Sequence, residues 1–173
     1  MGRETPTLPD DDAQADTYLA MCGELRRHGF EHYEISNFAL PGFRSRHNSR
    51  YWDLSEYIGL GPGAHSLFGG RRVEFPREIT AFIDGTSAVR NEEEVPDFER
   101  QNEYLMVRLR TSDGVDLRDL EKRYNIDSTP YEKVFSALRR PGLTEKSGTR
   151  WHLTEAGFLV SNSIINMITD AAT

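Results

Sequence analysis

The first apolar pattern along the chain has the spacing of a helix. Asp10 precedes it as a helix-capping residue, and Gly29 follows it at a position that favours glycine. The spacing therefore predicts a helix from Asp10 to about His28. Its apolar face carries Ala15, Tyr18, Leu19, Cys22 and Leu25. We expect Cys22 to be a small buried hydrophobic residue on this face.

Two strand-like runs follow the predicted helix. They cover Tyr33–Ala39 and Tyr57–Gly61, and turn residues close each of them. A helix followed at once by a strand is half of a parallel β-α-β unit, which needs further strands beside it. We therefore expect residues 1–66 to be the C-terminal remnant of a larger α/β domain. Unpaired strands of this kind expose backbone groups, so we expect self-association with another copy of the chain, a rearranged sheet or local disorder.

The middle of the chain has weaker patterning. Residues 67–96 are expected to form a connector with one short helix from Glu78 to Asp84. A polar loop is expected from Thr86 to Pro96, because an acidic run there is typical of a solvated segment.

The last third of the chain combines helices with one hairpin. Helix-capping residues at Asp97, Asp116 and Thr129 each precede an apolar pattern of helical period. Two short strands then form a hairpin, and a final helix begins after Thr154. This order predicts a mostly helical, winged-helix-like domain over residues 97–173. The chain as a whole is then of mixed class, α/β in its first part and α+β in its last.

Composition narrows the function classes. The chain has 173 residues, of which 21 are Lys or Arg and 28 are Asp or Glu, and its net charge is −7. Residues 97–173 carry 11 basic and 12 acidic side chains, whereas a phosphate-binding surface needs clustered positive charge. No apolar run approaches the ~20 residues that span a bilayer. We expect no nucleic-acid partner and no integral membrane segment.

The single cysteine, Cys22, excludes other chemistry. One thiol cannot form an intrachain disulfide, and it cannot supply the several thiolates that hold an iron–sulfur cluster. The lack of disulfide partners favours a reduced, cytoplasmic setting.

The segment Gly59–Gly63 is rich in glycine and follows a predicted strand. Its spacing is GxGxG with Pro62 inside it, whereas the dinucleotide-binding fingerprint is GxGxxG at the start of a helix. We interpret it instead as a strand end where the backbone closely approaches a ligand or a neighbouring strand.

The segment Arg44–Trp52 carries the densest set of polar and aromatic side chains. His47 and Tyr51 are four residues apart, so they share a face if the segment is helical, with Trp52 close by. An imidazole for iron, aromatic rings for a flat macrocycle and guanidiniums for propionates would together suit a heme. The alternative is a surface loop whose aromatic rings pack back onto the fold, because a single histidine is usually not a ligand.

Three segments carry a resemblance to a known family, namely Tyr33–Gly42, His47–Trp52 and Tyr57–Ser66. The sequence resembles the oxygen-independent coproporphyrinogen III oxidase family, which is the family of HemN-like radical-SAM proteins. It is most similar to the HemW branch, whose members are regarded as heme chaperones. The HNxxYW and YEISNFA strings within these segments distinguish that branch. Leu143–Gly157 is similar to the family's C-terminal domain.

The resemblance implies a fold and a set of cofactors. It implies the last strands of an incomplete radical-SAM (β/α) barrel, followed by the family's C-terminal domain. The CxxxCxxC motif for a [4Fe–4S] cluster and the glycine-rich motif for S-adenosylmethionine (SAM) are absent from this sequence. The chain is therefore expected to be a C-terminal fragment with no catalytic residue of its own. Cluster and SAM are implied for the full-length parent.

The resemblance also implies individual site residues. The implied heme contacts are His47, Asn48, Tyr51 and Trp52. The candidates for the heme propionates are Arg44, Arg46 and Arg50. Relatives often have a cysteine where this sequence has Ser45, which leaves His47 as the candidate ligand of the heme iron. In the oxidase branch, the alanine of an FAxP segment contacts SAM through its backbone. Ala39 is the matching residue in Phe38–Pro41, so the resemblance implies the same contact here.

We therefore expect the C-terminal part of a heme chaperone, which binds heme or porphyrin and delivers heme to a recipient protein. One alternative is a part of an oxygen-independent coproporphyrinogen III oxidase. A second alternative is a winged-helix module that binds nucleic acid or docks a protein. Whether the parent is an enzyme stays open at this point.

Overall fold

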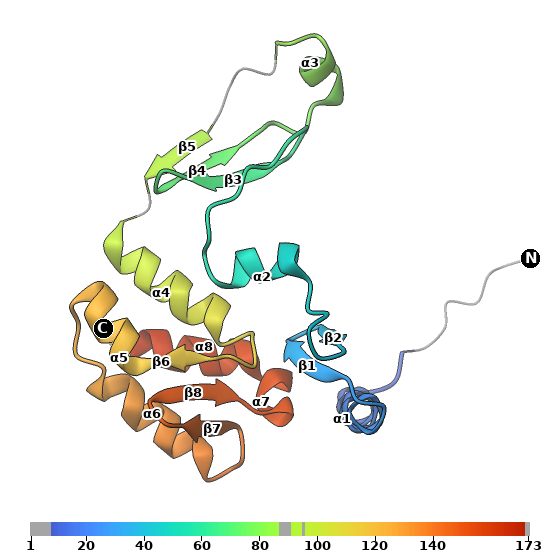
Figure 1. The fold of residues 1–173 in the computed structure, drawn as a ribbon, viewed down its shortest axis with the longest axis vertical. Helices are drawn as coiled ribbons and strands as arrows, with labels where there is room; N and C mark the ends of the chain where they lie inside the picture. Colours follow the sequence, from blue (N-terminus) through green and yellow to red (C-terminus); the bar gives the residue numbers. More distant parts are fainter. Residues whose placement is uncertain (1–7, 87–90, 95, 172–173) are drawn as a thin grey trace, which may run out of the picture.

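We describe the fold from a computed structural model, which defines residues 8–86, 91–94 and 96–171. Helices and strands are mixed along the whole chain (Figure 1). Among the residues so defined, no helix is long and apolar enough to cross a membrane.

Helix α1 (Asp11–Arg27) begins and ends as the sequence predicts. The side chain of Asp10 caps it by accepting a hydrogen bond from the amide of Ala13 at 2.8 Å. Gly29 follows the end of the helix with a φ of +83°, which only glycine adopts without strain. Cys22 is 1% exposed, so its predicted burial is confirmed.

The prediction of a single strand over residues 33–39 is wrong, because the segment folds back on itself. Strand β1 (Glu31–Glu34) pairs antiparallel with strand β2 (Asn37–Ala39). The buried carboxylate of Glu34 lies at the turn of this hairpin, where it accepts hydrogen bonds from the side chain of Asn37 and the amide of Ser36. These bonds satisfy a buried charge and close the turn.

The hairpin also pairs with the C-terminal part of the chain. The amide of Ile35 donates to the carbonyl of Arg110 at 2.8 Å, and the amide of Ser112 donates to the carbonyl of Tyr33 at 3.0 Å. The segment is therefore not left unpaired. Of the three expected alternatives, the structure shows a rearranged sheet whose partners lie within the chain.

The prediction of a second strand over Tyr57–Gly61 is also wrong, because the regular strand lies further along the chain. Tyr57 makes an isolated bridge with Leu67, and the regular strand is β3 (His65–Phe68). Gly59 lies against this strand, because a Cβ built on it would be 2.2 Å from the carbonyl oxygen of His65. The predicted close approach of the backbone at this glycine is confirmed.

The segment expected to be a connector contains a small sheet. Strands β3, β4 (Arg71–Glu74) and β5 (Asn91–Glu94) form an antiparallel sheet in that order. The prediction of a polar loop from Thr86 to Pro96 is therefore wrong over Asn91–Glu94, and its residues 87–90 and 95 lie outside the described residues. The predicted short helix is confirmed as α3 (Ile79–Ile83). Figure 1 shows this sheet and α3 projecting away from the rest of the fold.

The C-terminal part is a helical unit around a three-stranded antiparallel sheet with the order β6-β8-β7. Its elements are α4 (Asp97–Arg108), β6 (Val115–Asp116), α5 (Leu117–Tyr124), α6 (Thr129–Arg139), β7 (Thr144–Ser147), β8 (Arg150–Leu153), α7 (Glu155–Leu159) and α8 (Ser161–Asp170). At its core the rings of Phe135 and Trp151 stack with centroids 5.4 Å apart. The indole N–H of Trp151 donates to Glu132 at 2.8 Å, so the large ring is buried with its polar group satisfied.

The helix boundaries in this part agree with the sequence to within a residue or two. Asp116 caps α5, and Thr154 caps α7 by accepting from the amide of Gly157. Helix α6 includes Thr129, so Ser128 is the residue before it and not Thr129 as predicted. The single helix predicted after Thr154 is wrong, because the chain breaks it at Val160 into α7 and α8.

Candidate functional site

The segment singled out by its polar and aromatic residues is a helix, α2 (Arg46–Trp52). The side chain of Ser45 caps it by accepting a hydrogen bond from the amide of Asn48 at 3.2 Å. The hydroxyl of Ser49 donates to the carbonyl of Ser45 at 2.8 Å, which ties the first turn to the cap. The helical condition under which His47 and Tyr51 share a face is therefore met.

His47 and Tyr51 form an exposed pair on this helix. The Tyr51 hydroxyl lies 3.0 Å from Nε2 of His47, and the two rings meet edge to face with centroids 5.1 Å apart. Tyr57 extends the group, because its ring meets that of Tyr51 at 4.7 Å. Burial of Tyr57 raises the pKa of its phenol, and the neighbouring Tyr51 adds to the effect. The result is a solvent-facing imidazole beside a surface of aromatic rings.

Trp52 closes a different side of α2. It is half-buried, and it lines a small cavity of about 70 Å³ together with Tyr33, Arg108 and Thr111. The indole N–H of Trp52 is buried and has no hydrogen-bond partner among the residues that the structure describes. This cavity lies where α2 meets the start of the C-terminal unit.

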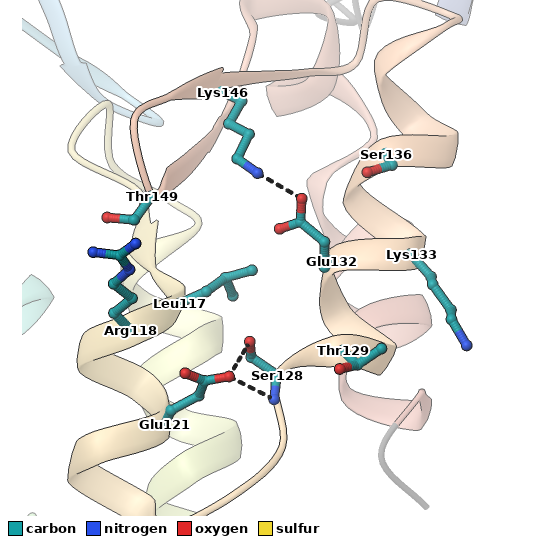
Figure 2. Close-up of a pocket in the computed structure, with 10 residues that line it drawn as sticks. All are labelled: Leu117, Arg118, Glu121, Ser128, Thr129, Glu132, Lys133, Ser136, Lys146 and Thr149. Atoms are coloured by element: carbon teal, nitrogen blue, oxygen red, sulfur yellow. Dashed lines mark hydrogen bonds and ion pairs between the residues drawn. The ribbon is translucent and has the colours of Figure 1, made fainter.

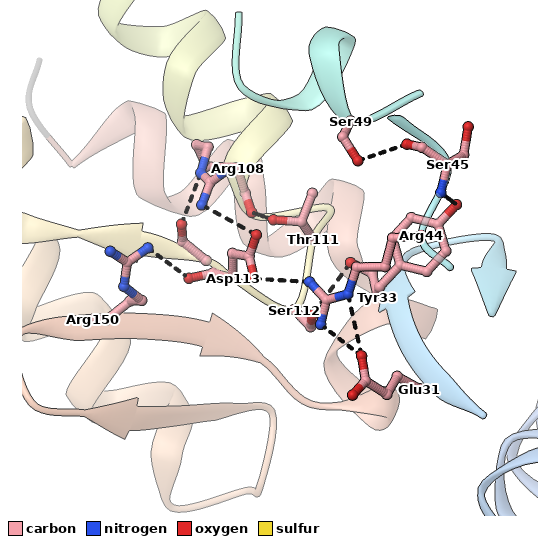
Figure 3. A network of polar contacts seen from close by, with 11 residues as sticks. Glu31, Tyr33, Arg44, Ser45, Ser49, Arg108, Thr111, Ser112, Asp113 and Arg150 are labelled. Atoms are coloured by element: carbon pink, nitrogen blue, oxygen red, sulfur yellow. Dashed lines mark hydrogen bonds and ion pairs between the residues drawn. The ribbon is translucent and has the colours of Figure 1, made fainter. Parts of the chain in front are cut away.

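The three candidate arginines differ in their surroundings. Arg44 forms ion pairs with Glu31 and Asp113, each at 3.1 Å, and its guanidinium lies 5.7 Å from the centre of the Tyr33 ring (Figure 3). Partial burial acts to lower the pKa of Arg44, but hydrogen bonds to the two carboxylates outweigh it, so the pKa is raised. Arg46 and Arg50 are exposed on α2. Arg44 is thus bound within the fold, whereas the other two face solvent.

Two further predicted residues are Asn48, which lies on α2 itself, and Ala39, which lies on β2. Asn48 is half-buried in the first turn of α2. Ala39 is buried at the end of β2, where it pairs with Glu31 across the hairpin. Tyr57 was not among the predicted heme contacts, although its aromatic ring six positions after Tyr51 was a usable signal.

A separate cleft of about 630 Å³ lies between α5, α6 and the β7–β8 hairpin (Figure 2). Acidic and basic side chains both line this cleft, and several of these side chains already have a partner. Lys146 contacts Glu132 at 2.6 Å, and the hydroxyl of Ser128 donates to Glu121 at 2.7 Å. None of the residues predicted to contact heme lines this cleft.

Comparison with known proteins gives the family context. Residues 96–160 match the model of the HemN C-terminal domain. The heme chaperone HemW of Lactococcus lactis is 31% identical over 163 residues, which cover 91% of this chain and 42% of that protein. A mouse protein, the mitochondrial radical S-adenosyl methionine domain-containing protein 1, is 38% identical over 127 residues, which cover 64% of this chain and 28% of that protein. The chain thus spans less than half the length of these relatives.

A solved structure shares the fold. Coproporphyrinogen III oxidase (HemN) from Escherichia coli superposes with a TM-score of 0.68 over 94% of this chain and 42% of that chain. The two sequences are 15% identical over this region, so the likeness concerns the fold.

Proposed function

Because this chain belongs to the HemN family, with HemW proteins among its relatives, we propose that it is the heme-binding part of a heme chaperone. The observation that carries the proposal is the exposed pair of His47 and Tyr51 on α2. An imidazole is a good ligand for heme iron, and here it stands at the surface, where a large planar ligand can reach it. Heme is then the cargo of the chain, held until a recipient protein takes it.

The aromatic and apolar side chains near α2 support the same proposal. The rings of Tyr51 and Tyr57 lie beside the imidazole and can cover one face of a porphyrin. The segments that lead into and out of α2 expose further apolar side chains, with Phe43 at 78%, Ile58 at 67% and Leu60 at 89%. Exposed apolar side chains of this size are typical of a surface that binds a ligand or a partner.

The propionates of heme would meet Arg46 and Arg50 in this proposal. Both guanidiniums face solvent on the helix that carries His47, and Arg is well suited to carboxylates. Each such exposed ion pair contributes at most about 1 kcal/mol, so the iron–imidazole contact has to provide more of the affinity. Arg44 would reach a propionate only by leaving Glu31 and Asp113, and we propose that it holds α2 in place.

Asn48 and Trp52 complete the proposed heme contacts. Trp52 lies on a different side of α2 from His47 and Tyr51, and its indole N–H is buried, so a heme contact there requires α2 to move away from the C-terminal unit. Once exposed, this N–H suits a carboxylate oxygen. Asn48 lies one position after His47 and offers a carboxamide at the start of α2.

A [4Fe–4S] cluster does not fit this chain. Cys22 is its single thiol, and the side chain is buried against α7 and β1. We therefore derive no radical step here, and Ala39 remains a proposed backbone contact to SAM in the longer relatives. In the same proposal residues 1–66 correspond to the end of the relatives' barrel and residues 97–173 to a winged-helix-like domain.

The experiment that tests this function has two stages. The chain is first titrated with heme, and its Soret band is followed to saturation. The loaded chain is then mixed with an apo-hemoprotein acceptor such as apomyoglobin, and the transfer of the band is followed with time. We expect one saturable heme per chain and transfer to the acceptor. Non-saturable binding, or heme that the acceptor cannot take, would contradict the proposal.

A further inference from the structure

Three metal-ligating side chains from α1, β1 and α7 meet in one group that includes none of the heme candidates. Cys22 comes from α1, His32 from β1 and Glu155 from the start of α7. Nδ1 of His32 lies 4.0 Å from Sγ of Cys22 and 4.0 Å from a carboxylate oxygen of Glu155. All three donor atoms lie within 4.8 Å of one another.

We propose that Cys22, His32 and Glu155 bind one transition-metal dication of the zinc class. A thiolate, an imidazole and a carboxylate are all ligands that Zn²⁺ accepts, at about 2.3 Å for sulfur and about 2.0–2.2 Å for nitrogen and oxygen. In a tetrahedral site these lengths place sulfur and nitrogen about 3.5 Å apart. The observed 4.0 Å would close by about half an ångström on binding, which a side-chain rotation provides.

The surroundings of His32 hold its ring in the orientation that the site needs. The imidazole stacks on Phe38 with centroids 4.1 Å apart, and it meets Phe158 edge to face at 5.0 Å. Its other nitrogen, Nε2, lies 3.5 Å from the hydroxyl of Tyr18. A partner on the second nitrogen of a ligating histidine fixes the tautomer and the ring orientation, which is the usual arrangement in metal sites.

The proposed site opens to solvent, and the guanidinium of Arg26 lies beside one of its ligands. An open pocket of about 340 Å³ is lined by His32, Glu155 and Arg26, so an ion can reach His32 and Glu155 from solvent, with the buried Cys22 behind them. Arg26 pairs with Glu155, and the Arg26 side chain is 64% exposed. A dication balances the thiolate and the carboxylate, and the exposed guanidinium can turn to solvent or to the second carboxylate oxygen. Binding releases the thiol proton of Cys22 to water.

The proposed ion would join distant parts of the chain. Its ligands come from the first helix, the first strand and a C-terminal helix. Helix α1 contacts both other elements, and His32 of β1 meets Phe158 of α7. A metal that binds the folded chain and not the unfolded one stabilises it by mass action. The proposal does not depend on heme, because His47 and Tyr51 take no part in this group.

Cobalt is the probe for the test, because thiolate coordination to Co²⁺ gives a charge-transfer absorption. The untagged chain is reduced, stripped of metal and titrated with Co²⁺, and Zn²⁺ is then added. Since Cys22 is the single cysteine, any such band reports this residue. We expect one Co²⁺ per chain, a thiolate band, displacement by Zn²⁺ and a higher unfolding temperature with Zn²⁺. A wild-type chain without the thiolate band would overturn the proposal.

Variants identify the other ligands. We expect Cys22→Ala to abolish the band, and His32→Ala and Glu155→Gln each to weaken Zn²⁺ binding at least about tenfold. The matched control is His28→Ala, because His28 is exposed at the end of α1 beside a glutamate. Circular dichroism checks that each variant is folded. Equal Zn²⁺ affinity in folded His32→Ala and wild type would show that Cys22 and His32 form only a hydrogen bond, and would overturn the site.

Discussion

The hydroxyl of Tyr51 lies 3.0 Å from Nε2 of His47, so this ring nitrogen is already hydrogen-bonded to the phenol. The contact spans one helical turn, and the edge-to-face packing of the two rings accompanies it. A heme iron that binds Nε2 has to displace the phenol first. The ring of Tyr51 is then free to lie against the porphyrin.

This contact gives a prediction for Tyr51→Phe. The substitution keeps an aromatic ring beside His47 but removes the competing hydrogen bond, which is worth about 0.5–1.5 kcal/mol. We expect heme affinity to rise by about twofold to tenfold. Titration of both proteins by the Soret band measures the change. A weaker affinity would mean that the phenol itself holds the heme or orients the imidazole through this bond.

A second prediction concerns the cap of α5. Asp116 accepts hydrogen bonds from the amide of Arg118 at 3.0 Å and from the hydroxyl of Thr149 at 2.9 Å. Burial acts to raise the pKa of Asp116, but these bonds and the charge of Arg150 outweigh it and lower the pKa. We expect Asp116→Ala to reduce the free energy of unfolding by about 1 kcal/mol at neutral pH.

The same group sets a pH dependence. Because the pKa of Asp116 is lower in the folded chain, its stabilisation is present above the pKa of the unfolded chain. It is lost as the pH falls through the folded-state pKa. Urea unfolding of wild type and Asp116→Ala should therefore differ at pH 7 and converge in acid, with Asp16→Ala, an exposed change on α1, as the control. A constant difference at all pH values would contradict this account of the cap.

Amide exchange tests how the β1–β2 hairpin is attached. The amides of Ile35 and Ser112 donate across the junction between the hairpin and the C-terminal unit. We expect the exchange rates of both amides to be at least about ten times lower than that of Leu60, a residue that is 89% exposed. Rapid exchange at Ile35 and Ser112 would mean that the hairpin does not stay docked.

The cysteine content gives a fourth prediction. Anaerobic incubation of the chain with iron, sulfide and a reductant should leave no stoichiometric [4Fe–4S] cluster, and SAM should not be cleaved. Iron and sulfide analysis after desalting provides the measurement. Four irons and four sulfides per chain, the content of such a cluster, would show that the cluster is held in a way that one thiol does not explain.

The elements with local signals were predictable from the sequence. Helix α1 carries its own cap in Asp10. Helix α2 was only a condition of the sequence argument, which kept a surface loop as the alternative, although Ser45 before it was a usable capping signal. The β7–β8 hairpin follows from turn residues between the two short segments Leu143–Glu145 and Arg150–Leu153. In each case the residues that decide the structure lie within a few positions of one another.

Elements that depend on distant contacts were not predictable in this way. The segment over residues 33–39 has the composition of one strand, but it folds into a hairpin that pairs with residues 110–112, far along the chain. Strand β5 has an acidic sequence and pairs with β4 all the same. The group of Cys22, His32 and Glu155 joins residues far apart in the chain, so no local pattern reveals it.

The central claim is that His47 binds heme iron, and a comparison of histidine variants tests it most directly. His47→Ala is titrated with heme beside wild type, His28→Ala and His152→Ala, and the Soret band gives each affinity. His28 is exposed at the end of α1, and His152 is half-buried in β8, so neither lies on α2. We predict that His47→Ala weakens heme binding by about tenfold or more while the other two match wild type. Equal affinities in all four proteins would contradict the claim.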